Sequence, residues 1–175
     1  AVKSYEKAIA INPEYAKAHY NLGDAFHQQS KYDESITSYQ KSIEIDSNYA
    51  DAFNNLGNVY RENNQFNEAV KSYEKALAIN PNFVEAHHGF GIVLHELGQL
   101  DSMIDHLEQV ISLQPGLAEV HNRIGAGFEE LGQLENAIRS FQKAIDINNK
   151  YSEAYNNLGN AYKKLEKLED AVDSY

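Results

Sequence analysis

Four of the chain's histidines fall within one short stretch, and imidazole is the side chain most often used to bind metals or transfer protons near neutral pH. They are His87, His88, His95 and His106. A helix would place His88 and His95 on one face, with Glu85 one turn before His88. Two helical turns rise about 10.5 Å, however, which is long for two ligands of one ion. We therefore predict no metal site and no cofactor.

Other arrangements that could support catalysis are not evident in the sequence. The chain has no cysteine, which excludes disulfides, thiolate nucleophiles and cysteine-ligated zinc. Neither a phosphate-binding loop, G-x-x-x-x-G-K-[ST], nor a nucleophile elbow, G-x-S-x-G, occurs. Carboxylates are numerous, but no pair is indicated by its spacing. The sequence therefore predicts a protein that is not an enzyme.

The elements that carry these residues are indicated by a strict repeat. Glycines recur every 34 residues, at Gly23, Gly57, Gly91, Gly125 and Gly159. Three other columns keep the same register. The third residue after each glycine is large and apolar, as in Phe26, Tyr60, Leu94, Phe128 and Tyr162. The sixteenth is mostly aromatic, as in Tyr39, Tyr73, Leu107, Phe141 and Tyr175. Proline follows eight residues later in three of the copies, as Pro13, Pro81 and Pro115.

Each column has a physical reason in a pair of helices. Apolar residues three and four apart form one stripe on a helix. The glycine and the residue twelve positions after it, which is small in most copies (as in Ala69 and Ala137), let two helices approach closely. Aromatic residues fill the space between neighbouring repeats, and proline stops the second helix. For residues 50–83 we expect a first helix at 51–63, a turn at 64–66 and a second helix at 67–79.

These columns together resemble the tetratricopeptide repeat family over the whole chain. The resemblance implies an all-α fold, a right-handed α-solenoid of antiparallel helix pairs built from 34-residue repeats. We expect one solenoid domain over 1–175, with repeats 16–49, 50–83, 84–117 and 118–151. Partial repeats 1–15 and 152–175 flank them, so the chain looks like a fragment of a longer solenoid. The family serves many unrelated partners, and the function implied is protein binding.

Composition limits the partners. The net charge is −11, which argues against nucleic acid, because phosphates attract a basic surface. No run is apolar enough to span a bilayer, and we expect a cytoplasmic location. Repeat 84–117 has no Lys or Arg, and we interpret its acidic residues either as a solvated face or as a patch for a basic segment. They are Glu85, Glu96, Asp101, Asp105 and Glu108.

In this family the first helices of successive repeats line a concave groove, so polar residues near each glycine are the candidate binding site. Asparagine both donates and accepts, so a row of asparagines could hold a peptide backbone or simply solvate a helix face. The row resembles the asparagine ladder of the repeat domain in O-linked N-acetylglucosamine transferases, although Gly89 and Arg123 interrupt it. The candidate residues are Asn21, Asp24, Asn54, Asn55, Asn58, Arg61, His88, Asn122, Arg123, Asn156, Asn157 and Asn160.

A second family precedent, the clamp for a C-terminal carboxylate, is not supported. The position that would supply lysine beside Arg123 is Glu119, and acidic residues there would repel a carboxylate. Three hypotheses remain: a scaffold for a protein or peptide partner, the targeting domain of a larger enzyme such as a glycosyltransferase, and a scaffold that self-associates. The last follows from the near-identity of 1–5 and 171–175, which predicts end-to-end stacking.

Overall fold

A computed structural model describes residues 1–166 and residue 171. The secondary structure of these residues is entirely α-helical, which confirms the predicted fold class. The helices in this part of the chain are α1 (Val2–Ile11), α2 (Ala16–His27), α3 (Tyr32–Ile45), α4 (Ala50–Glu62), α5 (Phe66–Ile79), α6 (Val84–Glu96), α7 (Leu100–Leu113), α8 (Ala118–Glu130), α9 (Leu134–Ile147) and α10 (Ser152–Lys164).

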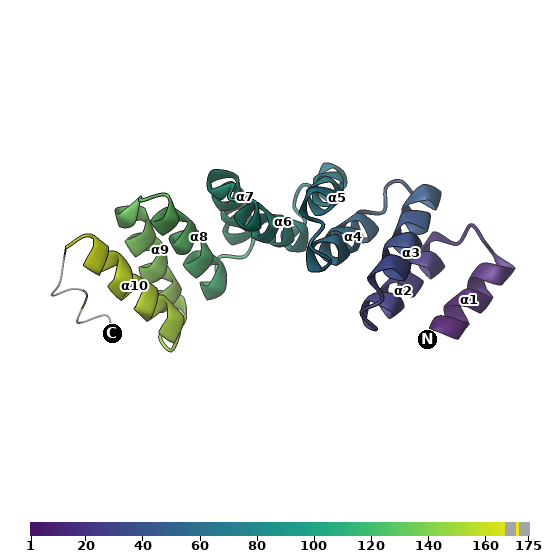
Figure 1. Ribbon diagram of the computed structural model, residues 1–175, viewed down its shortest axis with the longest axis horizontal. Coiled ribbons are helices and arrows are strands. Elements are labelled where there is room, and N and C mark those ends of the chain that lie inside the picture. Colours follow the sequence, from purple (N-terminus) through teal and green to yellow (C-terminus); the bar gives the residue numbers. More distant parts are fainter. Residues whose placement is uncertain (167–170, 172–175) are drawn as a thin grey trace. The chain divides into compact units, whose positions relative to one another are not determined.

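Consecutive helices form adjacent antiparallel pairs, as Figure 1 shows for α2 with α3 and for α8 with α9. Helix α4 begins one residue before the predicted 51–63, and α5 begins one residue before the predicted 67–79. The second helix that the sequence predicts after α10 lies mostly outside the described residues. Each repeat is thus a helix pair, and we refer below to its first and second helix.

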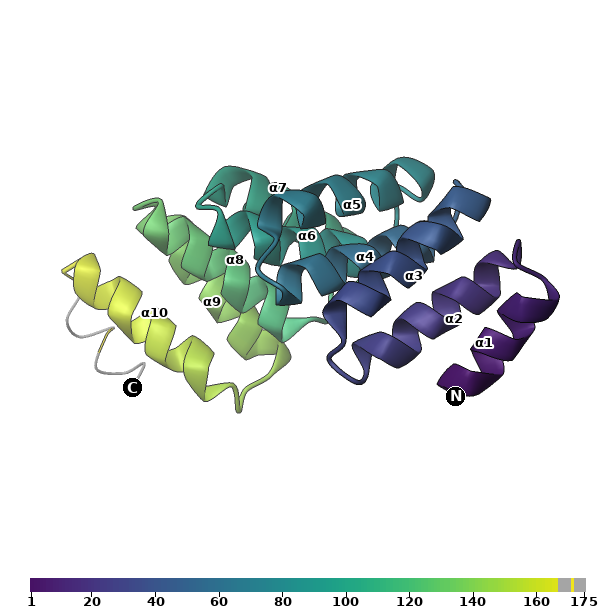
Figure 2. The same cartoon turned by 45° about the vertical axis from the view of Figure 1, so that its right-hand side comes forward.

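The chain forms two compact units, residues 1–93 and 94–175, which we call the N-terminal and C-terminal units. Helices α1 to α5 belong to the first, and α7 to α10 belong to the second, while α6 contains the boundary. Figure 2 shows α2, α3 and α4 side by side in the N-terminal unit. Continuity of the two units in one right-handed solenoid stays a prediction.

The repeat glycines accommodate an aromatic ring of the second helix. A Cβ added at Gly57 would lie 2.8 Å from the Tyr73 ring, and one at Gly125 would lie 2.6 Å from Phe141. Both rings are fully buried. The close approach of the two helices is therefore set by glycine, because any side chain there would collide with the ring.

The expected location of these aromatics needs a correction. The rings occupy the space between the two helices of their own repeat rather than only the space between repeats. Tyr73 also reaches the next repeat, because a Cβ at Gly89 would lie 2.7 Å from its hydroxyl oxygen and its ring stacks on Phe90. One ring thus packs both within and between repeats.

The role expected for proline is also incomplete. Helices α3 and α9 end at the same repeat position as α5, although Ser47 and Asn149 stand where other repeats have proline. In repeats with and without proline, a carboxamide or carboxylate one residue after the helix accepts the backbone N–H two positions on. Asp46 Oδ1 accepts from Asn48 N at 3.0 Å, and three other copies repeat this Asx turn.

Candidate protein-binding surface

In the N-terminal unit, polar side chains join α2 to α4. Asn55 Nδ2 donates to the hydroxyl of Tyr20 at 2.9 Å and to Asp24 Oδ1 at 3.1 Å. These contacts connect residues one repeat apart and are partly buried. The asparagine that the sequence places in a binding row therefore also fastens neighbouring first helices to each other.

The C-terminal unit repeats this connection with different residues. Asn157 Nδ2 on α10 donates to Asn122 Oδ1 on α8 at 3.1 Å. Asn122 Nδ2 in turn donates to Glu153 Oε1 at 3.0 Å. Asn122 is only 2% exposed, so its amide lies inside the repeat junction rather than on a surface that a ligand would contact.

The interruption at Gly89 has a structural cause. Asn54 occupies the repeat position of Asn122, but the position equivalent to Asn157 is Gly89, which has no side chain to donate. Asn54 is 5% exposed, and its Oδ1 has no hydrogen-bond partner within the described residues. Gly89 cannot carry a side chain because the Tyr73 hydroxyl occupies that space.

Two further candidates, Asp24 and Asn58, receive hydrogen bonds from buried tyrosines. Tyr73 donates to Asn58 Oδ1 at 2.7 Å, and Tyr39 donates to Asp24 Oδ1. Burial raises the pKa of Tyr73 to about 12, with the nearby Arg61 charge opposing the effect. Burial also raises the pKa of Tyr39, and the hydrogen bond to Asp24 adds to this. Both hydroxyls therefore stay protonated and act as donors.

The other candidates are more accessible. Arg123, Asn156 and Asn160 are exposed, whereas Asn21, Arg61 and His88 are half-buried. Arg123 forms an ion pair with Glu119 on the same helix at 3.0 Å. Asn160 Nδ2 donates to Asn156 Oδ1 at 3.4 Å. The predicted row thus divides into amides committed to helix junctions and side chains that reach solvent.

Three histidines have a structural role that the sequence predicts only as packing. His19 Nε2 lies 2.9 Å from the carbonyl oxygen of Pro13, and His87 Nε2 lies 2.9 Å from that of Pro81. His121 has the same relation to Pro115, and burial lowers its pKa, so the neutral ring is favoured. The signal was available in the sequence, because each of these histidines follows a loop proline by six residues.

Charged side chains also connect first helices, at a separation of 35 residues that sequence reasoning missed. Lys164 Nζ lies 2.7 Å from Glu129 Oε1, with the Glu129 side chain only 15% exposed. Two histidine–glutamate contacts have the same separation, His27 with Glu62 at 2.8 Å and His95 with Glu130 at 3.0 Å. A column that pairs Lys or His with a Glu displaced by one residue in the next repeat would have revealed them.

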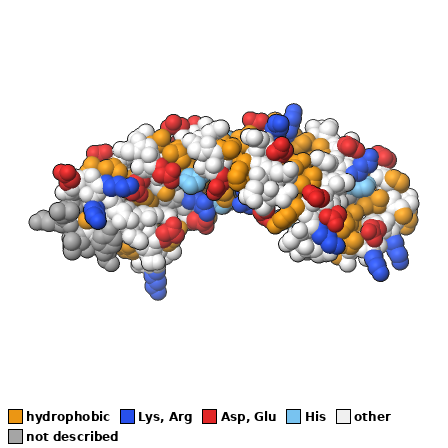
Figure 3. All heavy atoms as spheres, viewed as in Figure 1, with side chains coloured by type: hydrophobic (Ala, Val, Ile, Leu, Met, Phe, Trp, Pro, Cys, Tyr) orange, Lys and Arg blue, Asp and Glu red, His pale blue; other side chains and the backbone are white. Residues whose placement is uncertain are grey.

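The described residues hold no cluster of three or more His, Asp or Glu side chains placed to bind a metal. The acidic residues of repeat 84–117 are all exposed. On the face drawn in Figure 3, Asp and Glu side chains are dispersed among Lys and Arg. No helix in the described part of the chain has the length and apolarity needed to cross a membrane. The surface is suited to hydrogen bonding with a polar ligand.

Helix pairs at a 34-residue period, several of them with an aromatic ring packed on a glycine, define a helical repeat protein. Family models agree. Models described as TPR repeat match residues 1–30, 23–63, 57–98 and 128–166, and one described as Tetratricopeptide repeat matches 84–116. The chain belongs to the tetratricopeptide repeat family.

Several solved structures are similar to this chain. YrrB, described as a TPR protein with an unusual peptide-binding site, is 26% identical, with a TM-score of 0.89 over 99% of this chain and 90% of its own. MamA from Desulfovibrio magneticus RS-1 is 21% identical, with a TM-score of 0.85 over 91% and 90% of the two chains. PilF of Pseudomonas aeruginosa is 21% identical, with a TM-score of 0.76 over 91% and 73%. None of the curated proteins compared with the chain matches it.

Proposed function

We propose that this chain is a non-enzymatic scaffold that binds an extended peptide segment along the polar side chains of its first helices. The observation that carries the proposal is the division of the polar row. In the C-terminal unit the amide of Asn157 joins α10 to α8, while Arg123, Asn156 and Asn160 reach solvent on the same two helices. The similarity to YrrB, whose description includes a peptide-binding site, supports the same conclusion.

The division suggests how such a site would act. Hydrogen bonds between first helices fix their relative position, so the exposed side chains start from a preorganised arrangement, which lowers the entropic cost of binding. An asparagine amide offers both a donor and an acceptor, as a peptide backbone does. We expect contacts mainly with the backbone of the ligand and therefore a weak dependence on its sequence.

A triple variant, Arg123→Ala, Asn156→Ala and Asn160→Ala, tests the proposal. Removing Asn55 and Asn157, which the sequence alone recommends, would also disturb the helix junctions. Short peptides selected by phage display on the unmodified chain serve as probes in titration calorimetry. We expect the triple variant to bind them about tenfold more weakly, a loss of about 1.4 kcal/mol, with unchanged helicity.

The matched control removes two asparagines and one basic side chain from a second helix and a loop: Asn67→Ala, Lys75→Ala and Asn149→Ala, all at exposed positions. Its affinity should equal that of the unmodified chain. Equal loss in both variants, or no loss in either, would refute binding along the first helices.

Self-association is a second candidate, favoured by one observation. Helix α1 has no buried residue, and the nearby apolar side chains of Ile11 and Tyr15 are 86% and 47% exposed. The segment 171–175, which nearly repeats 1–5 and would compete with it for the same place in the last repeat, lies outside the described residues except for Ala171. Ile11→Ser with Tyr15→Ser should abolish any concentration-dependent increase in mass by light scattering. A mass that stays monomeric in the unmodified chain would rule this candidate out.

A further inference from the structure

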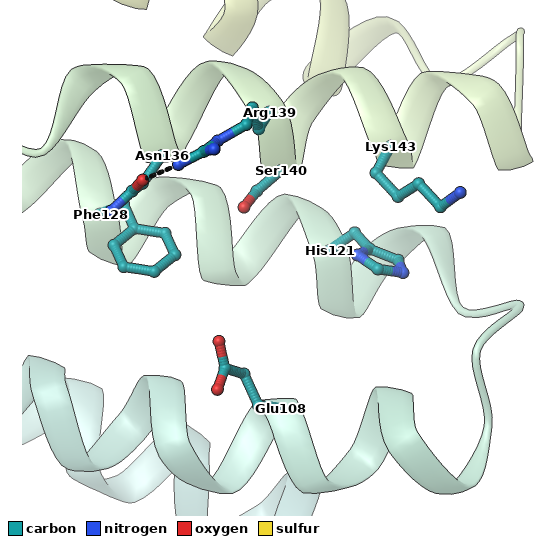
Figure 4. Close-up of a pocket in the computed structure, with 7 residues that line it drawn as sticks. All are labelled: Glu108, His121, Phe128, Asn136, Arg139, Ser140 and Lys143. Atoms are coloured by element: carbon teal, nitrogen blue, oxygen red, sulfur yellow. Dashed lines mark hydrogen bonds between the residues drawn. The ribbon is translucent and has the colours of Figure 1, made fainter.

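A cleft of about 430 Å³ lies between the second helix α7 and the helix pair α8 and α9 of the C-terminal unit (Figure 4). Its size is within the range of roughly 300–1,000 Å³ that is typical of ligand sites. None of the candidate residues above lines it. Its lining residues are Glu108, His121, Phe128, Asn136, Arg139, Ser140 and Lys143.

Comparison with an earlier repeat shows one contact that this cleft lacks. Two repeats earlier, the equivalents of Glu108 and Phe128 are Gln40 and Tyr60, and Gln40 Nε2 donates to the Tyr60 hydroxyl at 3.0 Å. That bond links α3 to α4. A carboxylate cannot donate it and phenylalanine has no hydroxyl to receive it, so the same link cannot form between α7 and α8.

The two walls of the cleft differ in charge. Arg139 and Lys143 are four residues apart on α9 and therefore share a face. Neither forms an ion pair with a carboxylate within the described residues, and Arg139 donates instead to Asn136 Oδ1. Figure 4 shows Glu108 on the opposite wall, facing Phe128 and Ser140 across the open space.

His121 adds little charge to this site. Burial and the positive charge of Lys143 lower its pKa, while the backbone of Pro115 opposes the shift through a hydrogen bond. His121 thus contributes a polar but neutral side chain to the lining of the cleft. A ligand would meet two cations along α9 and one carboxylate along α7.

We propose that this cleft is a second binding site, for an acidic peptide segment whose Asp or Glu side chains pair with Arg139 and Lys143. The backbone N–H groups of an extended peptide would face Glu108, which accepts hydrogen bonds. An apolar side chain of the same segment would pack on the half-buried ring of Phe128. The net charge of −11 does not prevent this, because charges beyond about 8 Å are largely screened at physiological salt.

The test is a titration of the isotopically labelled chain, followed by nuclear magnetic resonance. The probe is a short peptide with blocked ends, bearing adjacent Asp and Glu residues and one Phe. We expect shifts concentrated at the amides of α7, α8 and α9. Arg139→Ala with Lys143→Ala should weaken binding about fivefold or more, as expected for two exposed charge contacts.

Two further variants make the result specific. Glu108→Gln with Phe128→Tyr should restore the link present at Gln40 and Tyr60, close the cleft and abolish the shifts in a folded chain. Lys71→Ala with Lys75→Ala removes the same charges from the equivalent positions two repeats earlier and should change nothing.

Several outcomes would overturn the proposal. One is equal binding of a peptide with Asn and Gln in place of the acids, and another is equal weakening by the Lys71 and Lys75 control. A third is binding that persists in the closed variant. Shifts of the cleft residues that depend on chain concentration without peptide would assign the site to a second copy instead.

Discussion

The two units place different side chains at the same repeat position. Against the repeat glycine, the N-terminal unit packs Tyr39 and Tyr73, whereas the C-terminal unit packs Phe141. The residue after that glycine changes with it. It is Asp24 or Asn58 where the ring carries a hydroxyl, and Ala126 where it does not. A buried hydroxyl is thus present only where an acceptor is supplied, because an unsatisfied one costs about 1–3 kcal/mol.

A polar contact between neighbouring helices also differs between the units. Gln40 and Tyr60 join two helices of the N-terminal unit, while Glu108 and Phe128 leave a cleft in the C-terminal unit. The same two repeat positions therefore link α3 to α4 but cannot link α7 to α8. The repeat determines the helix pairs, and individual side chains decide which neighbouring helices are linked.

We expect the largest effect from replacing the repeat glycines, whose close contact with an aromatic ring occurs in both units. Gly57→Leu and Gly125→Leu should each destabilise the chain by about 3 kcal/mol, because the new side chain collides with Tyr73 or Phe141. Thermal unfolding followed by circular dichroism measures the change. Gly116→Ala is the control, since a Cβ there has no neighbour within 4 Å. An unchanged melting temperature at Gly57 would show that this contact does not limit helix approach.

The next largest effect is expected at alkaline pH, from the titration of Tyr73 in the N-terminal unit. The pKa of Tyr73 rises from 10.0 to about 12 on folding. The contribution of this shift to the free energy of unfolding is fully present below pH 10.0. It is lost as the pH rises through about 12, because the unfolded chain releases the proton first. Two pKa units correspond to about 2.7 kcal/mol.

Denaturant unfolding at successive pH values should therefore show a steeper alkaline loss of stability in the unmodified chain than in Tyr73→Phe. Tyr15→Phe, at an exposed ring, is the comparison. Parallel pH curves for the unmodified chain and Tyr73→Phe would contradict this prediction.

The third test replaces the buried phenylalanine of the C-terminal unit by the tyrosine found at the same repeat position in the N-terminal unit. Phe141→Tyr introduces a hydroxyl opposite Ala126, and we expect a loss of about 1–2 kcal/mol. Adding Ala126→Asn should recover most of this, because it recreates the pair formed by Tyr73 and Asn58. A double-mutant cycle on unfolding free energies measures the coupling. Zero coupling would mean that the covariation of the two positions has another cause.

The smallest effect is expected at the charged contacts between first helices. Glu129→Gln removes the partner of Lys164, and we expect a loss of about 0.5 kcal/mol, which decreases as salt is added. Glu135→Gln, at an exposed position on α9, serves as the control. A loss several times larger would indicate that this pair is an essential part of the junction.

The sequence by itself determined the family and the helix pairs. Glycine, small and aromatic columns act over a few turns, so their spacing was enough to predict α4 and α5 within one residue. It did not determine how helices end, because the Asx turn at Asp46 ends α3 without proline. The bounds of the helices and the Asx turns that follow them both depend on residues close together in the chain.

Only the tertiary structure decided which polar residues reach solvent. Asn54 and Asn156 occupy the same repeat position, yet the first is 5% exposed and the second is an exposed residue. The cleft at Glu108 likewise depends on side chains from three helices. Burial and hydrogen bonding at these positions depend on neighbours 20 to 35 residues distant, and repeat spacing alone does not specify which atoms meet there.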